Sequence, residues 1–220
     1  MTVQDILNME IPIEFGTDDE GEFTPSMDSV VDNIDNTEFA FGATKFVIFI
    51  NEKEVVKIPF NGTFWYDYNE DDETETLRFW DFHTKDYCAV EANIYDEAEE
   101  EGLEEFFAST KYIGQSINGK PIYVSERVIP FNDNNEEVKE KTNSYTKENL
   151  ETADTLRDEF RTRLSSEWIA RAIEYYGFDR VLELLDFIDM ENICDLHSNN
   201  IGFRINGAPV IFDYSSYWEG

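Results

Sequence analysis

The dominant hydrophobic period of this chain differs between its first and second parts, and that difference constrains the fold more than any other feature. In the first part, apolar residues form short runs typical of β-strands. In the second part, they recur every three or four residues, as on the buried face of a helix. The stretch between them, 131–147, is rich in Asn and Glu and is expected to be a linker. The pattern therefore predicts an α+β protein with a sheet-rich part and a helical part.

The first part contains five segments that we expect to be strands. Their β-branched and aromatic residues are the types that pack well on a pleated sheet. The first two segments are separated by a plausible turn at Asn51-Glu52, and the next two by an acidic loop at 69–73 that belongs on the surface. The segments are Phe39–Ile50, Lys53–Phe60, Thr63–Tyr68, Leu77–Phe82 and Pro121–Val128.

One helix is expected within this part, over Asp86–Glu101. Val90, Ile94 and Ala98 recur at helical spacing, and Gly102 stands where a helix would stop. The resulting sheet-rich part is predicted to span 37–130. The preceding residues, 1–36, mix short apolar pieces with an acidic run and are expected to form an irregular extension.

The second part, 148–220, contains three apolar stripes with helical spacing, followed by two short strands. Ser165 is placed as a helix cap and Gly177 as a helix stop. Asn206-Gly207 fits a tight hairpin turn, because both residue types tolerate positive φ. The helical stripes run over 150–164, 168–176 and 181–188, and the strands over 201–205 and 209–212.

The net charge of −32 comes from 49 acidic and 17 basic residues. Such a charge repels nucleic-acid phosphates and anionic membranes, so we expect no direct nucleic-acid binding and no membrane binding. This negative charge has two open interpretations, a solvated acidic coat or a surface that attracts a basic partner. The chain starts without the pattern of a signal peptide and has no apolar run near about 18 residues, which predicts a cytoplasmic protein. Cys88 and Cys194 form no CxxC pair, which argues against a zinc site.

The segment from Asp195 to Asp213 holds the clearest chemical pattern. Asp195 and Asn200 share one loop, and Asp213 follows the second strand of the expected hairpin. A hairpin brings its two ends together, so Asn200 and Asp213 are predicted to lie close to each other. Their oxygen atoms suit Mg²⁺, which prefers hard ligands. Asp195 would remain available to accept a proton from an attacking hydroxyl group.

This segment resembles the protein-kinase-like superfamily, whose catalytic loop reads Asp-Leu-x-x-x-x-Asn. Asp195, Leu196 and Asn200 match that loop, and Asp213 matches the metal-binding Asp that follows the hairpin. His197 resembles the aminoglycoside and choline kinases, whose catalytic loop carries a histidine at the same position. Two positions depart from the pattern, since Ile193 replaces a His or Tyr and the Asp-Phe-Gly motif reads Asp-Tyr-Ser here.

The resemblance implies further site residues in the sheet-rich part. Glu54-Val-Val-Lys57-Ile resembles the V-A-I-K strand, so Lys57 would bind the ATP phosphates unless it lies on a solvated sheet face. Glu91 is the first choice for the helix glutamate that orients this lysine, and Glu97 is the second. Gly42 is the remnant of the phosphate-covering loop, and the backbone of Glu126 and Val128 would bind adenine with Ser125 behind it.

The resemblance also implies a truncated helical lobe, because only seven residues follow Asp213 where the family has an activation segment and further helices. In this respect the chain is similar to short kinase-like proteins of tailed bacteriophages, whose location would be the host cytoplasm. The implied function is an ATP- and Mg²⁺-dependent phosphotransferase, expected to be a monomer. Two alternatives stay open, a pseudokinase that binds a host protein and an acidic decoy that mimics nucleic acid for a basic host protein.

Overall fold

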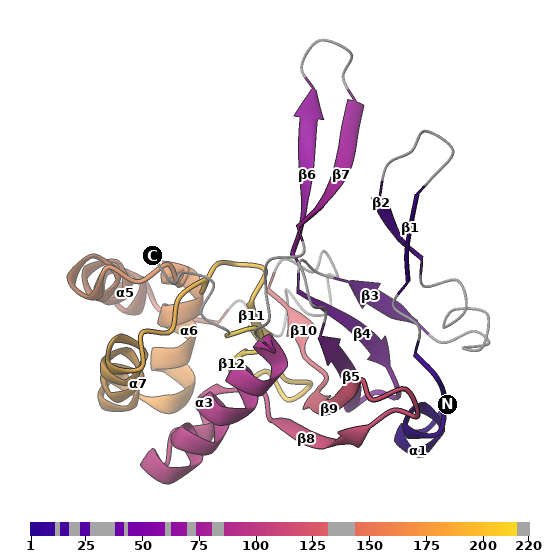
Figure 1. The fold of residues 1–220 in the computed structure, drawn as a ribbon. Helices are drawn as coiled ribbons and strands as arrows, with labels where there is room; N and C mark the ends of the chain where they lie inside the picture. The colour runs from indigo at the N-terminus through magenta and orange to yellow at the C-terminus, as the bar shows by residue number, and fades with distance from the viewer. Residues whose placement is uncertain are drawn as a thin grey trace. The chain divides into compact units, whose positions relative to one another are not determined.

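The chain folds into an α+β structure with a five-stranded antiparallel sheet and several helices (Figure 1). The computed structural model describes residues 1–11, 14–17, 23–26, 38–41, 44–59, 63–69, 74–80, 86–131 and 144–214. Two compact units divide the chain. The first comprises Met1–Ala89 and Lys111–Ser125, and the second Val90–Thr110 and Glu126–Gly220. These units are not the parts expected from the sequence, which began at residues 37, 131 and 148. Those expected boundaries stay predictions.

The first unit is built on the five-stranded sheet, whose strand order is β3-β4-β5-β9-β8. Neighbouring strands β4 and β5 are antiparallel, with Val47 opposite Lys57 and Phe46 opposite Ile58. Counted along the chain, β5 is the third strand of the sheet. The strands are β3 (Phe39–Phe41), β4 (Lys45–Phe49), β5 (Glu54–Pro59), β8 (Thr110–Gln115) and β9 (Pro121–Glu126).

The two faces of this sheet carry different side chains, because successive residues of a strand point to opposite faces. One face is apolar and packs with Ile6 and Ile11 of the N-terminal segment, which includes α1 (Val3–Leu7). A capping box between Thr2 and Asp5 starts this short helix. The apolar face consists of Phe46, Ile48, Val56, Ile58 and Ile122. The alternate residues of the same strands, among them Lys45 and Lys57, therefore lie on the other face.

Two separate hairpins also belong to the first unit. β6 (Thr63–Asn69) pairs antiparallel with β7 (Thr74–Trp80), which confirms the strand pair expected here. β1 (Glu14–Thr17) pairs with β2 (Phe23–Ser26) in the region expected to be irregular. The acidic residues 70–73 lie outside the described part of the chain.

The second unit combines helices with a three-stranded sheet of order β10-β11-β12. Ser165 caps α6 by accepting a hydrogen bond from the Trp168 N–H, and Gly177 at φ 95° ends that helix, so both sequence signals are confirmed. Its elements are most of α3 (Tyr87–Glu101), η1 (Glu104–Phe106), α5 (Lys147–Phe160), α6 (Ser166–Tyr176), α7 (Phe178–Met190), β10 (Ile129–Pro130), β11 (Ile201–Phe203) and β12 (Pro209–Ile211).

The core of the second unit holds the β11–β12 hairpin against the helices. Trp168 on α6 is fully buried and donates a hydrogen bond from Nε1 to the Gly202 carbonyl oxygen at 3.2 Å. Tyr214, just beyond the hairpin, is also fully buried and donates to the Ala108 carbonyl oxygen at 2.7 Å. Its ring meets that of Phe107 edge-on, with centroids 5.1 Å apart. These contacts fix both ends of the segment that carries Asn200 and Asp213.

An arginine clamp adds polar contacts to this core. The Arg204 Nε donates to both carboxylate oxygens of Glu126, at 2.9 and 3.0 Å. The Nη atoms of the same side chain donate to the carbonyl oxygens of Glu105 and Phe107. The planar guanidinium can serve these acceptors at once, which a lysine could not do with one ammonium group.

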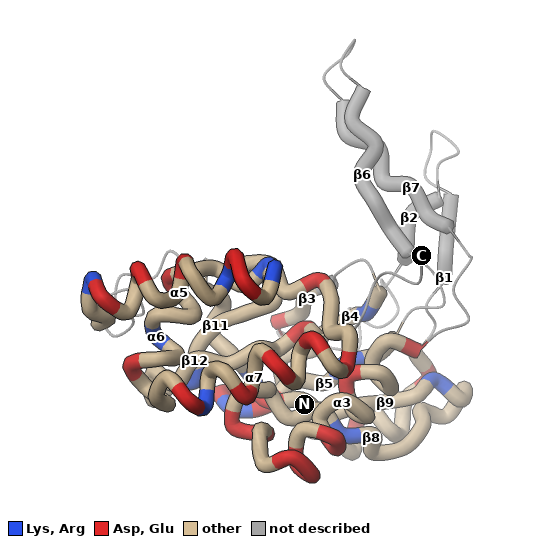
Figure 2. The backbone as a smooth tube through the Cα atoms, turned by 90° about the vertical axis from the view of Figure 1, so that its left-hand side faces the viewer, with Lys and Arg blue, Asp and Glu red and all other residues tan. Residues whose placement is uncertain are grey.

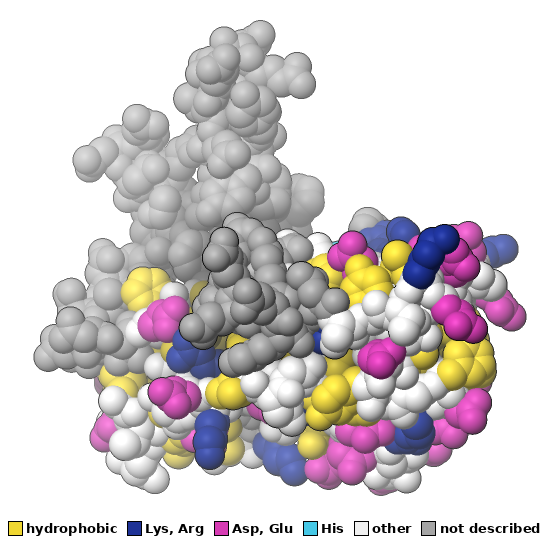
Figure 3. Space-filling model, turned by 180° about the vertical axis from the view of Figure 1, so that it is seen from behind, with side chains coloured by type: hydrophobic (Ala, Val, Ile, Leu, Met, Phe, Trp, Pro, Cys, Tyr) yellow, Lys and Arg dark blue, Asp and Glu magenta, His cyan; other side chains and the backbone are white. Residues whose placement is uncertain are grey.

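Charged residues are unevenly spread over the second unit. Acidic residues occur along α3, α5 and α7, whereas basic residues mark the two ends of α5 (Figure 2). On the face seen in Figure 3, acidic side chains are interspersed with apolar and basic ones among the described residues. Within the described part of the chain, no helix has the length and apolar character needed to cross a membrane.

Candidate functional site

The candidate catalytic loop begins a few residues after α7 ends at Met190. Asn192 at φ 50° and Asp195 at φ 61° adopt left-handed backbone conformations that non-glycine residues rarely use. The Asn200 side chain holds the loop in place, because its Nδ2 donates to the Asp195 carbonyl oxygen at 2.6 Å and to Oδ2 of the same residue at 3.3 Å. Such unfavourable backbone conformations concentrate at functional sites, where the surroundings hold them.

The hairpin brings Asp213 beside this loop. The backbone N–H groups of Phe212 and Asp213 both donate to the Asn200 carbonyl oxygen, at 3.0 and 3.3 Å. Asn200 itself is 7% exposed and Asp213 is half-buried. Asp195, Asn200 and Asp213 are thus gathered at one end of the hairpin, although thirteen positions separate the last two in sequence.

The carboxyl group of Asp195 has an altered proton affinity. Burial raises its pKa above the ordinary value of 3.8, and the negative charge of Asp213 adds to that rise. His197, Asn200 and Arg163 oppose the rise, because positive charge and hydrogen bonding favour the carboxylate. The His197 Nε2 lies 3.3 Å from Asp195 Oδ1. Asp195 is therefore a carboxylate whose basicity depends on four named neighbours.

The donor set at this end of the hairpin fits a hard cation. Because Asn200 uses Nδ2 to bind Asp195, its Oδ1 is turned away from Asp195 and is a suitable ligand atom. Asp213, whose backbone N–H bonds the Asn200 carbonyl oxygen, carries a carboxylate, and amide and carboxylate oxygens are the ligands that Mg²⁺ accepts from proteins. Among the described residues, no group of three or more His, Cys, Asp or Glu side chains is arranged to hold a metal ion.

The first unit contains the candidate phosphate-binding lysine. Lys57 lies on β5 and is 5% exposed. A second lysine, Lys45 on β4, is 3% exposed. Because Val47 pairs with Lys57 and Lys45 is two residues before Val47, both lysines point to the same face of the sheet. Sequence inspection missed Lys45, since only the pairing register reveals that it accompanies Lys57.

The two candidate helix glutamates differ in burial. Glu91 on α3 is fully buried and accepts a hydrogen bond from the Thr110 hydroxyl at 3.5 Å. Glu97 on the same helix is exposed. Its pKa is raised by partial burial and by a hydrogen bond and charge repulsion with Glu191. Glu91 belongs to the second unit and Lys57 to the first, so their pairing stays a prediction.

In the candidate adenine-binding segment, some polar groups are already bonded within the protein. The Glu126 N–H donates to the Ser109 carbonyl oxygen at 2.9 Å, so only its carbonyl oxygen would remain for a base. The Glu126 carboxylate is bound by Arg204. Val128 is half-buried, and Ser125 is 2% exposed. Gly42, the candidate glycine of the phosphate-covering loop, lies outside the described residues.

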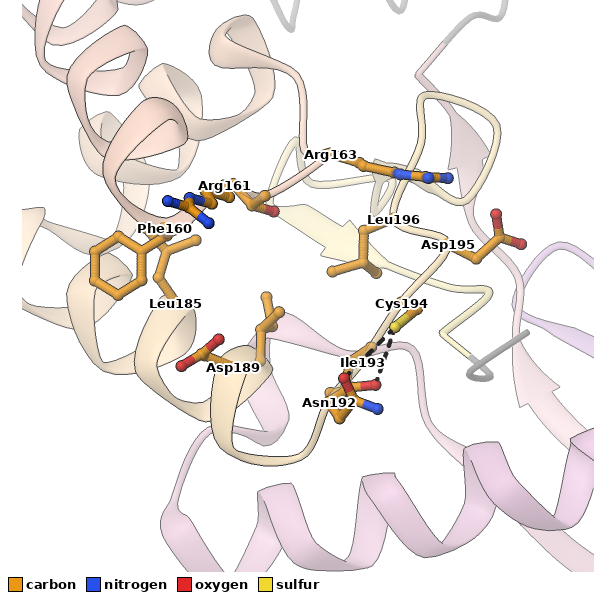
Figure 4. A pocket seen from close by; sticks show the side chains of 12 residues that line it. Phe160, Arg161, Arg163, Leu185, Asp189, Asn192, Ile193, Cys194, Asp195 and Leu196 are labelled. Atoms are coloured by element: carbon orange, nitrogen blue, oxygen red, sulfur yellow. Dashed lines mark hydrogen bonds between the residues drawn. The ribbon is translucent and has the colours of Figure 1, made fainter. Parts of the chain in front are cut away.

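A cavity of about 500 Å³ adjoins the catalytic loop within the second unit (Figure 4). Arg161 and Arg163, from the segment between α5 and α6, lie along one edge, and Asp189 on α7 lies across from them. Leu185 and Ile188 form part of the apolar lining of this cavity. Sequence inspection missed both arginines, although an Arg-Thr-Arg segment between two helices of an acidic chain was an available signal.

No protein-family model, curated protein or solved structure matches this chain.

Proposed function

We propose that this chain is an ATP- and Mg²⁺-dependent phosphotransferase of the protein-kinase-like type. Asp195 acts as the base for the acceptor hydroxyl, and Asn200 and Asp213 hold the metal. Lys57 neutralises phosphate charge and Glu91 orients it. The carbonyl oxygen of Glu126 and the backbone of Val128 bind the adenine base, while Gly42 lies in the loop over the phosphates.

The observation that carries this proposal is the convergence of Asp195, Asn200 and Asp213. Asn200 contacts Asp195 through its side chain and Asp213 through its backbone, so one amide residue connects the candidate base to the second candidate metal ligand. When bound, Mg²⁺ would neutralise charge on the transferred phosphoryl group. The hairpin contacts keep the two ligand residues in register before any ligand arrives, which lowers the cost of ordering the site.

The order of elements along the chain gives separate support. The proposal requires a lysine on the third strand and a glutamate on the helix that follows. Lys57 is on β5, the third strand of the five-stranded sheet in chain order, and Glu91 is on α3, which comes before β8 and β9. Both residues are buried, which is unusual for charged side chains without a structural or functional role.

The proposed chemistry is largely one of positioning. The Asp195 carboxylate accepts the proton of the acceptor hydroxyl as the oxygen attacks, and the raised pKa makes this group a better base than an ordinary surface aspartate. The contact with His197 and the hydrogen bond from Asn200 orient the carboxylate. Lys57 would stabilise negative charge on the phosphates during transfer.

The direct test measures ADP formation by the purified full chain with ATP and Mg²⁺. We expect Asp213→Asn to abolish it, and Asp186→Asn, an exposed change on α7 with the same loss of charge, to leave it intact. Full activity of Asp213→Asn would refute the mechanism. Thermal stabilisation by Mg²⁺-ATP without ADP formation would instead favour the pseudokinase alternative. Salt-sensitive competition with DNA for a basic protein, in the absence of nucleotide binding, would favour the acidic decoy.

A further inference from the structure

His197 connects the candidate base with the rest of the catalytic loop. Its Nε2 lies 3.3 Å from Asp195 Oδ1. Its Nδ1 accepts a hydrogen bond from the Asn199 N–H at 3.2 Å, and its carbonyl oxygen accepts one from the Asn200 N–H at 2.9 Å. This half-buried residue therefore contacts the candidate base through one ring nitrogen and the following backbone through the other.

The hydrogen bond from Asn199 decides where the imidazole of His197 carries its proton. An N–H group donates only to a nitrogen with a lone pair, so Nδ1 is unprotonated. A neutral imidazole has one ring proton, which in this case is on Nε2. An imidazolium would carry a proton on both nitrogens and could not accept this hydrogen bond. The ring is thus neutral, with its proton on the nitrogen nearest to Asp195.

This form of the ring excludes His197 as the base for the acceptor hydroxyl. Histidine is the side chain that most often serves as a general base, so an imbalance between His197 and Asp195 has to be argued from geometry. The protonated Nε2 has no lone pair for a further proton, and the lone pair of Nδ1 is used by the Asn199 N–H. The proton of the hydroxyl group can therefore pass only to the Asp195 carboxylate.

The Asp195 carboxylate is contacted on both of its oxygen atoms. His197 Nε2 lies beside Oδ1, and Asn200 Nδ2 donates to Oδ2 at 3.3 Å. Each carboxylate oxygen has about two lone-pair sites, so both oxygens can still accept a proton. Contacts on different oxygens restrict rotation about the Cβ–Cγ bond more than a single contact would. Figure 4 shows the carboxylate pointing away from the apolar lining of the neighbouring cavity, so its oxygens are presented outside that lining.

We infer that His197 is a positioning residue for Asp195, whose neutral imidazole holds the carboxylate in the orientation that receives the proton. This role rests on the proposed phosphotransferase function. The acceptor oxygen forms a bond to the γ-phosphorus while its proton passes to Asp195. The bond between the γ-phosphorus and the β–γ bridging oxygen breaks, and ADP leaves with that electron pair. Asp195 then releases the proton to solvent, and His197 keeps its own proton throughout.

Two amide substitutions separate the two ring nitrogens. The side-chain amide of Gln reaches about as far as Nε2, so His197→Gln keeps a donor for Asp195 and loses the acceptor for Asn199. The shorter amide of Asn reaches about as far as Nδ1, so His197→Asn keeps that acceptor and loses the donor. Each variant is therefore the matched control of the other.

The kinetic test measures ADP formation by the full chain with ATP and Mg²⁺, where water serves as the acceptor. We expect His197→Asn to lower kcat by about tenfold to a hundredfold, because a misdirected catalytic group costs about that much, and to leave KM for ATP unchanged. His197→Gln should stay close to the original chain. A purely structural role predicts the reverse order, because only His197→Asn keeps the hydrogen bond of the loop backbone. Equal loss in both variants, or a larger loss in His197→Gln, would overturn the inference.

A second measurement does not depend on activity. The chain has two histidines, His83 and His197, so His83→Gln leaves a single imidazole. Nitrogen-15 magnetic resonance of this ring at about pH 8, where an ordinary imidazole is neutral, reports which nitrogen is protonated. We expect a protonated Nε2 and an unprotonated Nδ1. A protonated Nδ1, or the averaged signals of two exchanging forms, would contradict the assignment.

The outcomes distinguish this inference from the proposed function. A chain that never forms ADP would refute the proposed function, together with the positioning role that rests on it. ADP formation that responds equally to both amide substitutions, or that accompanies a protonated Nδ1, would refute the role of His197 alone. ADP formation with the expected order of the two variants and the expected ring form supports both.

Discussion

The side-chain amide of Asn200 binds Asp195 twice, through the backbone carbonyl oxygen at 2.6 Å and the carboxylate at 3.3 Å. One amide group thus fixes both the left-handed backbone of Asp195 and the direction of its carboxylate. The same contacts decide which end of Asn200 is left for a cation, because an amide that donates through nitrogen presents oxygen on its other side. The candidate base and the candidate metal ligand are therefore coupled before any ligand binds.

This coupling predicts that Asn200→Ala destabilises the protein by about 1–3 kcal/mol. The change removes two hydrogen bonds of a largely buried side chain and leaves the Asp195 carbonyl and carboxylate oxygens without this donor. Urea unfolding measures the change. Asn199→Ala is the control, since that neighbouring asparagine is exposed. Equal stability of the two variants would mean that the Asn200 contacts do not hold the loop.

Gly202 predicts a steric effect in the same hairpin. A Cβ at this position would lie 2.2 Å from the Ile129 carbonyl oxygen and 2.8 Å from Val128 Cγ1. Gly202→Ala should therefore push β10 and β11 apart and destabilise the protein by about 1–3 kcal/mol or more, as measured by urea unfolding. Adding Val128→Ala should not restore stability, because the closer obstacle is backbone. A full rescue by that second change would show that the side chain alone causes the clash.

The exposed glutamate pair on the second unit predicts a pH effect. Partial burial raises the pKa of Glu97 above its ordinary value of 4.5, and a hydrogen bond and charge repulsion with Glu191 raise it further. The folded state thus binds the proton more tightly than the unfolded state. This contribution to stability is complete below pH 4.5 and is lost as the pH rises through the raised value. Glu97→Gln should therefore stabilise the protein at pH 7, and this gain should disappear near pH 4.

The matched control for that pH effect is Glu101→Gln on the same helix. In a chain with a net charge of −32, removing any negative charge lowers self-repulsion, so a small gain at pH 7 is general. Only the excess of Glu97→Gln over Glu101→Gln reports the contact with Glu191. Thermal unfolding of both variants from pH 4 to pH 7 measures this excess, and identical curves would contradict the prediction.

Local signals explain what could be predicted from sequence. The helices α5, α6 and α7 follow the apolar stripes, and Ser165 and Gly177 mark their boundaries as expected. Asp195, Asn200 and Asp213 could be grouped because a single hairpin joins them. By contrast, α1 has only five residues, and β8 has one fully buried residue and a glycine next to its last residue, so neither carries a readable period.

Features that depend on register or on distant segments could not be predicted in this way. Lys45 joins Lys57 only through the pairing of β4 with β5, because a shift of one residue would turn it to the opposite face. The cavity likewise combines the segment after α5 with the end of α7 and the loop after it. A sequence shows the arginines of that segment but not the apolar residues of α7 and the following loop that line the same cavity.

The last prediction concerns the two buried lysines of the first unit. Lys45 and Lys57 point to the same face of the sheet and are 3% and 5% exposed. If that face binds the phosphates of ATP, Lys45→Met and Lys57→Met should each reduce the thermal stabilisation by Mg²⁺-ATP, because stabilisation grows with the logarithm of ligand concentration over Kd. A tenfold loss of affinity at saturating nucleotide would lower this stabilisation by about 1.4 kcal/mol. Lys53→Met is the control. Lys53 is exposed in the turn between β4 and β5, and its substitution removes the same charge. A reduction confined to Lys57→Met would exclude Lys45 from the site, and equal reductions in all three variants would show that only net charge matters.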